Sequence, residues 1–190
     1  MNNRDRTTAI VDRTLTIMVT GSAISASLVL PGLIIGLEKP LNVFWKHMDK
    51  RSRERELRTV ITYMKSRDLI RGNYDHGLQI TNKGRKRLQK IEFKKLTVKS
   101  PQKWDRRWRL IFFDIPENLR QNRKAFIRKL SSIGCRQLQK SVWIHPFPCR
   151  EVIEKIANFD NVDTHVTYVE TSYIDNEKKL KEMFKNILKN

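Results

Sequence analysis

The chain has 190 residues, enough for one or two domains, and its 39% hydrophobic content is too high for a disordered chain. Its 39 basic residues against 20 acidic ones leave a formal net charge of +19, which favours a polyanionic partner: nucleic acid first, an anionic membrane second. A purely solubilising surface would not need so large an excess, because self-repulsion destabilises a compact domain. Cys135 and Cys149 lack zinc-ligand spacing, so we expect free thiols in a reducing cytoplasm.

The N-terminal part of the chain contains a long uncharged stretch. We expect the polar segment Met1–Arg13 to be a frayed start or a first turn, and no charged residue follows from Thr14 to Leu37. That length would allow a membrane anchor or a signal peptide. Hydroxyl side chains dilute its apolar character, however, and Gly21 and Gly36 interrupt it. A helical stripe through Ile17, Ile24 and Leu28 favours a core helix ending at Pro31-Gly32, so no membrane contact is expected.

The segment Lys50–Met64 has the features of a recognition helix. Arginines crowd its first half, and Ser52 is suited to be its N-cap. The apolar residues recur at helical spacing, and they are Leu57, Val60, Ile61 and Met64. A helix with an apolar back and a cationic start is typical of a helix whose N-terminal part enters the major groove of DNA.

A hairpin and a further helix are predicted next. Leu69-Ile70 and Leu78–Thr81 have the pattern of short strands, and Arg71–Gly77 supplies turn residues between them. A basic helix is expected to begin near Thr81. Helix, hairpin with a polar tip and helix together indicate a winged helix, and residues 50–95 hold 15 basic and 5 acidic residues. A solvated pair of basic helices that never touches DNA is the alternative.

The candidate DNA contacts come from the recognition helix, the hairpin and the start of the last helix. At the hairpin tip, contact with the minor groove or backbone and a plain exposed turn are both open. The full set of candidates is Arg51, Ser52, Arg53, Arg55, Arg58, Arg71, Tyr74, His76, Lys83 and Arg85.

The second half of the chain is built around a strand that ends in an acid. The apolar run Leu110–Phe113 precedes Asp114, and the strand should stop there because Pro116 cannot donate to a sheet. A basic helix is predicted next, with Gly134 in the place of its C-cap. Its apolar residues are Leu119, Phe126, Ile127, Leu130 and Ile133. Val142–His145 then has the pattern of another strand.

The remaining elements are expected in the order helix, strand, helix. Cys149–Phe159 is predicted as a helix and Val162–Val169 as a strand. Asp175 or Asn176 can cap a final amphipathic helix. The apolar face of that last helix is expected to consist of Leu180, Met183, Phe184, Ile187 and Leu188.

Several short motifs between Trp104 and Cys149 resemble known families. Trp104-Asp105-x-x-Trp108-Arg109, Phe113–Pro116 and Leu138–Trp143 are similar to motifs of the PaaX-like transcriptional regulators. The stretch also resembles the small CRISPR-associated endonuclease of spacer acquisition. The matching residues there are Asp114, Arg123, Gly134, Gln139, Ser141, Val142 and Trp143.

The resemblance implies an α+β protein in which a winged helix-turn-helix domain precedes a ferredoxin-like βαββαβ domain and a C-terminal helix. We therefore expect a winged-helix DNA-binding domain at residues 1–95 and a linker at 96–103. A ferredoxin-like dimerisation domain would occupy 104–172, and the amphipathic helix 173–190. The expected function is a cytoplasmic, homodimeric, sequence-specific regulator, a repressor, that binds double-stranded DNA and needs no cofactor.

The alternative function depends on Asp114. In the endonuclease family two subunits bring their aspartates together, so Asp114 would be the catalytic residue and the Mg²⁺ ligand of a metal-dependent nuclease. A scaffold that binds duplex DNA beside CRISPR adaptation proteins without cutting it is a third possibility. The structural interpretation is that Asp114 caps the following helix. We also expect a structural role for His145, and for Trp104 and Trp108 in packing.

Overall fold

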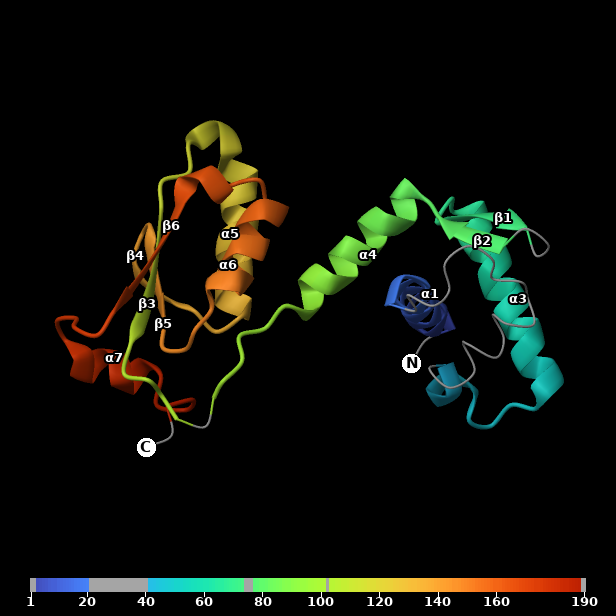
Figure 1. Cartoon of the computed structure of the whole chain (residues 1–190), viewed down its shortest axis with the longest axis horizontal. Coiled ribbons are helices and arrows are strands. Elements are labelled where there is room, and N and C mark those ends of the chain that lie inside the picture. The colour runs from blue at the N-terminus through green and yellow to red at the C-terminus, as the bar shows by residue number, and fades with distance from the viewer. Residues whose placement is uncertain (1–2, 21–40, 74–76, 102, 189–190) are drawn as a thin grey trace. The chain divides into compact units, whose positions relative to one another are not determined.

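The computed structural model describes residues 3–20, 41–73, 77–101 and 103–188 (Figure 1). The chain divides into two compact units, Met1–Lys94 (unit 1) and Lys95–Asn190 (unit 2). Each unit has its own core, and each is described separately below.

Unit 1 has the element order of a winged helix. Helix α1 spans Asn3–Thr20, residues 41–45 are helical, and α3 spans Lys50–Ser66. Strands β1 (Ile70–Asn73) and β2 (Gly77–Ile80) then pair as an antiparallel hairpin. Helix α4 (Asn82–Lys95) follows. The predicted order of helix, hairpin and basic helix is confirmed.

The core of unit 1 is formed where α1, α3 and the hairpin meet. The apolar face predicted for α3 is buried as expected, and each such side chain contributes roughly 1.5–3 kcal/mol. The fully buried residues contributed by α1 and by residues 41–45 are Ile10, Val11, Leu15, Leu41 and Trp45. One small core therefore joins the helices to the hairpin, which contributes Ile70 and Leu78.

Helix α1 begins at Asn3, so the segment Met1–Arg13, expected to be a frayed start or a first turn, supplies more than half of this helix. Ile10 and Val11 are already buried within this segment, which was taken as polar. Residues 21–40, including the predicted end at Pro31-Gly32, lie outside the described residues. Within the described part of the chain, no helix is long and apolar enough to cross a membrane.

The N-cap of α3 is Asp49, so the prediction of Ser52 is wrong. The Asp49 carboxylate accepts hydrogen bonds from the Ser52 backbone N–H and from the Ser52 hydroxyl, both at 2.9 Å. These bonds stabilise the ionised carboxylate and lower its pKa. Aspartate and serine are both good N-caps, and the helix begins at Lys50, directly after the aspartate.

Unit 2 is a ferredoxin-like βαββαβ domain with an added helix. Its strands are β3 (Trp108–Phe113), β4 (Arg136–Gln139), β5 (Val142–His145) and β6 (Val166–Thr171). Their order in the sheet is β4-β5-β3-β6, and all neighbours are antiparallel. The helices are α5 (Arg120–Ser132), α6 (Arg150–Phe159) and α7 (Glu177–Met183), with short 3-10 turns at Glu117–Leu119 and Asp163–His165.

The sheet of unit 2 is covered unequally on its two faces. Helices α5 and α6 lie along one face of the sheet (Figure 1). On this face the rings of Phe113 and Phe126 meet edge to face, with their centroids 5.5 Å apart. Helix α7 lies on the other face and packs Leu180 and Phe184 against Trp108. Because α7 is short, it covers only the Trp108 end of this face.

Within the motif Trp104-Asp105-x-x-Trp108-Arg109, the buried Arg109 binds neighbouring groups and has a structural role. The guanidinium of Arg109, 2% exposed, donates to both carboxylate oxygens of Asp105 and, at 2.8 Å, to the carbonyl of Pro146. The indole N–H of Trp104 donates to the same carbonyl at 2.9 Å. The Arg109 hydrogen bond lowers the pKa of Asp105, so the pair stays ionised. Trp104 and Trp108 pack in unit 2, as predicted.

Several finer predictions for unit 2 need correction. Strand β6 begins at Val166, because a 3-10 turn occupies the preceding residues. Asn176 precedes α7 in a left-handed conformation without a side-chain capping bond, and Met183 is 37% exposed. Strand β4 was implied by the fold but not located. The helix end at Gly134, whose φ is +94°, is confirmed, and Cys135 and Cys149 are buried free thiols as predicted.

Candidate nucleic-acid interface

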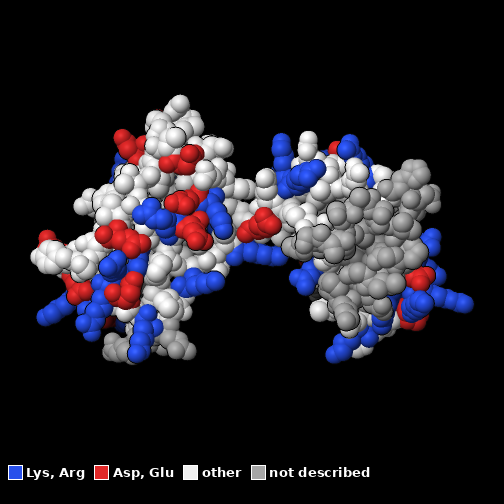
Figure 2. All heavy atoms as spheres, in the orientation of Figure 1, with Lys and Arg blue, Asp and Glu red and all other residues white. Residues whose placement is uncertain are grey.

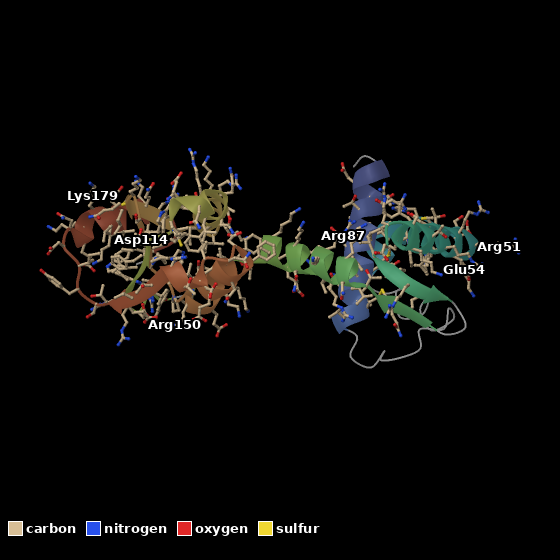
Figure 3. The ribbon with its side chains drawn as sticks, turned by 90° about the horizontal axis from the view of Figure 1, so that it is seen from above. Arg51, Glu54, Arg87, Asp114, Arg150 and Lys179 are labelled. Carbon is tan, nitrogen blue, oxygen red and sulfur yellow. The ribbon has the colours of Figure 1, made fainter. Side chains whose placement is uncertain are left out.

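Helix α3 presents a cationic face opposite its buried face. Residues advance by about 100° along an α-helix, so Arg51, Arg55 and Arg58 lie on one side and the buried residues lie on the other. All three arginines are exposed, and none forms an ion pair with a described residue. Arg51 lies at the outer end of the helix (Figure 3). These three guanidinium groups are therefore available to an external anion.

Two other predicted contacts on α3 are engaged within the protein. Ser52 is bonded to Asp49, and the Arg53 Nε donates to the Met48 carbonyl at 2.8 Å. Both side chains are partly buried. Their contacts hold the start of α3, which fixes the direction in which the exposed arginines point.

An acidic residue of α3 is neutralised by α1. Arg6 forms an ion pair with Glu56 at 3.0 Å and also donates to the Phe44 carbonyl at 2.9 Å. This arrangement removes a negative charge that would otherwise oppose an anionic partner. It also ties α1 and the residues before α3 to the helix that carries the arginines.

The basic residues of unit 2 are more often balanced by acids. Ion pairs one turn apart join Arg150 to Glu154, Lys181 to Glu177 and Lys185 to Glu182. Basic and acidic atoms lie side by side over unit 2 in Figure 2. Arg51, Arg55 and Arg58 form no such ion pair with a described residue, although Glu54 lies beside them on α3, so their charges are less engaged than those of Arg150, Lys181 and Lys185.

The remaining predicted DNA contacts are divided between the hairpin and α4. Arg71 is exposed on β1, whereas Tyr74 and His76 lie outside the described residues. Lys83 and Arg85 are both exposed on α4, but two helical residues are about 200° apart, so they point to opposite sides. Lys86 and Lys90 were not among the predicted contacts, although both are exposed on α4 and their spacing from Lys83 was visible in the sequence.

Asp114 does not cap a helix, so its predicted structural role is wrong. Its exposed carboxylate makes no hydrogen bond with a described residue, while its backbone N–H donates to the His165 carbonyl at 3.1 Å. Pro116 holds an extended conformation and a 3-10 turn follows, so α5 begins six residues after Asp114. Neither helical segment has a side-chain capping bond.

Asp114 instead lines a shallow groove of about 450 Å³ at the end of β3, together with Ser141, Thr164 and His165. It is the single carboxylate among the lining residues. Elsewhere in the described residues, no three His, Cys, Asp or Glu side chains gather as metal ligands. One chain thus places one carboxylate at this groove.

His145 has a structural role, as predicted. It is 2% exposed, and its Nδ1 lies 3.1 Å from both the backbone nitrogen and the carbonyl oxygen of Phe147. Burial lowers its pKa, so the ring is neutral at physiological pH. Enclosed in this way, His145 cannot serve as a base for an external substrate.

The order of elements and of strands defines unit 2 as a ferredoxin-like domain. More specifically, residues 101–183 match the family described as the PaaX protein central Cas2-like domain. This part of the chain is therefore a PaaX-type central domain, and the resemblance seen in the sequence is confirmed over these residues. Comparisons with curated proteins and with solved structures returned no match.

Proposed function

We propose that the protein is a sequence-specific transcriptional regulator of the PaaX-like type, a repressor that binds double-stranded DNA as a homodimer. The observation that carries this proposal is the exposed, unpaired arginine face of α3 within a winged-helix unit. That unit is joined to a PaaX-type central domain, which supports the same assignment. Residues 1–95 would bind DNA, residues 104–172 would form the dimer contact, and 96–103 would join them.

The geometry of α3 suits reading of the major groove. In this mode the first half of the helix meets base edges, and arginine can bind the O6 and N7 atoms of guanine with two hydrogen bonds. Arg51, Arg55 and Arg58 occupy that half and share one side of the helix. The Asp49 cap and the Arg53–Met48 contact keep the helix start ordered, which reduces the entropy lost on binding.

The proposal is tested by footprinting the full-length protein on fragments of its own genome, with Mg²⁺ and with a chelator. A discrete protected site is expected under both conditions. The Arg51→Ala, Arg55→Ala and Arg58→Ala triple variant should lose protection. Its affinity for the site should fall by 100-fold or more, because each arginine–guanine pair discriminates by about 1–3 kcal/mol.

A matched variant controls for the loss of three positive charges. Arg120, Arg136 and Arg150 are exposed arginines of unit 2, and their joint replacement by Ala should leave the affinity within about threefold. Equal effects of the two triple variants would mean that net charge alone drives binding, and α3 would lose its assigned role. Absence of any protected site with the unmodified protein would refute the proposed function itself.

A further inference from the structure

Helix α4 carries a second cationic surface that differs from the one on α3. We infer that Lys83, Lys86 and Lys90 contact the phosphate backbone of the duplex outside the bases met by α3, anchoring the protein without reading sequence. This inference rests on the proposed function, because it names a further part of the DNA that the same unit would hold.

The three lysines form a continuous row on one side of α4. They are spaced by three and four residues, which places them on neighbouring turns of the same helix face. All three are exposed, and none has an ion-pair partner among the described residues. Glu92 is the single acid of α4 and lies about 180° around the helix axis from Lys83, so no acid of the helix interrupts the row.

The neighbouring arginine shows which side of α4 faces the protein. Arg87 forms an ion pair with Asp12 of α1, with contacts of 2.7 and 2.8 Å, and Figure 3 shows it beside α1. Gly84 and Leu88 are buried on the adjoining side. The protein therefore uses one basic residue of α4 for internal packing and leaves the lysine row outside.

The first turn of α4 is fixed to the end of α3 and the base of the hairpin. The Thr81 hydroxyl accepts from the Gly84 backbone N–H at 3.0 Å and donates to the Asp68 carbonyl at 2.6 Å. A Cβ atom at Gly84 would lie 2.2 Å from the Leu69 carbonyl oxygen, so only glycine allows this close approach. The lysine row is thus held at a set position relative to α3, as a backbone anchor requires.

The chemistry of the row favours phosphate over the alternatives. Lysine is a compact point charge on a flexible stem, suited to phosphate contacts that do not depend on sequence. From Lys83 to Lys90 the helix rises about 10 Å, roughly three phosphate steps of one DNA strand. No exposed large apolar residue occurs on α4, so insertion into a lipid surface is not supported.

The test uses the full-length protein in which Lys83, Lys86 and Lys90 are all replaced by Gln. Fluorescence anisotropy would measure its affinity for the footprinted site and for a scrambled duplex of equal length, across a range of salt concentrations. Affinity for both duplexes should fall by the same factor, roughly 10- to 100-fold near 0.1 M salt. The slope of log K against log salt should fall by about 0.9 for each lost contact.

The control variant replaces Lys155, Lys178 and Lys179, three exposed lysines of unit 2, with Gln. This variant loses the same number of charges, but from residues that the proposal does not place on DNA. Its affinities and slopes should therefore stay close to those of the unmodified protein. Circular dichroism should show equal thermal unfolding for all three proteins, because the six side chains are exposed.

Three other results would contradict this inference. Unchanged affinity and slope in the α4 variant, with binding still lost in the α3 arginine variant, would refute this inference and leave the proposed function standing. A selective loss on the footprinted site would show that the lysines read bases, which also contradicts it. If the unmodified protein binds neither duplex, the proposed function fails, and this inference fails with it.

Discussion

Asp160 is a buried carboxylate at the C-terminal end of α6. It is 8% exposed, and its Oδ2 atom has no hydrogen-bond partner among the described residues. Desolvation raises its pKa to about 6, and the nearby Arg128 offsets part of that effect. The folded protein therefore holds this proton more tightly than the unfolded chain does. Ionisation of Asp160 lowers stability as the pH rises from about 4 to about 6.

Replacing Asp160 with Asn should consequently stabilise unit 2 at neutral pH. We expect a gain of about 1–2 kcal/mol at pH 7 that disappears below about pH 4, where the aspartate is protonated in both states. Urea unfolding of both proteins at several pH values measures this difference. Asp163→Asn, an exposed aspartate nearby, should show no comparable dependence. A gain that is the same at pH 3.5 and pH 7 would contradict this account of Asp160.

Replacement of the single residue Asp114 distinguishes the regulator hypothesis from the nuclease hypothesis. Because its carboxylate makes no hydrogen bond with the described residues, Asp114→Asn should change the free energy of unfolding by less than about 0.5 kcal/mol. We expect no Mg²⁺-dependent cleavage of single- or double-stranded DNA or RNA by the unmodified protein. End-labelled substrates resolved on denaturing gels provide the measurement. Cleavage that disappears in the Asn variant, with folding intact, would establish the metal-dependent endonuclease instead.

At the scale of elements, local periodicity predicted those segments that bury one continuous face. The burial of Leu57, Val60, Ile61 and Met64 follows from the spacing of apolar residues. The bounds of β5 follow from its apolar run and from Pro146, which closes it. Strand β4 could not be located in this way. Its residues are exposed or partly exposed, and a bulge between Gln137 and Gln139 shifts its pairing. Pairing with β5, a tertiary property, defines it.

The candidate interface was predictable in composition but not in detail. The arginines of α3 were visible in the sequence, yet the true start of the helix and its neighbours decide which of them face outward. Arg53 sits among outward-facing arginines in the sequence, and the Met48 carbonyl engages it within the protein. Arg87 is likewise withdrawn by Asp12, which lies 75 positions away along the chain. Partners so far apart along the chain cannot be identified from the sequence around either residue.

At the scale of the whole molecule, unit 2 offers a surface suited to self-association. Phe112 and Val169 are 38% and 39% exposed and lie on the sheet face that α7 covers only in part. Leu110 pairs with Val169 in the register and shares that face. An apolar sheet face beside polar strands is typical of a contact between subunits, and a two-fold dimer would use the same patch twice.

We therefore expect the protein in solution to have twice the 22.6 kDa mass of one chain, as measured by light scattering during size-exclusion chromatography. Replacing Phe112 and Val169 together with Glu should yield monomers, because two charges cannot be buried against their own copies. Phe159→Glu provides the control, since this residue is equally exposed at 38% but belongs to α6 on the opposite face of the sheet. It should remain dimeric.

The same variants test whether dimerisation sets the shape of the DNA site. A two-fold dimer requires two half-sites related by symmetry, with centres about 10 base pairs apart or a multiple of that distance. The unmodified protein should protect both halves at one concentration, with two chains per duplex. The Phe112→Glu, Val169→Glu variant should bind a single half-site normally and lose the cooperative gain on the full site. Cooperative protection by a protein that stays monomeric on its own would place the dimer contact in unit 1 or on the DNA itself.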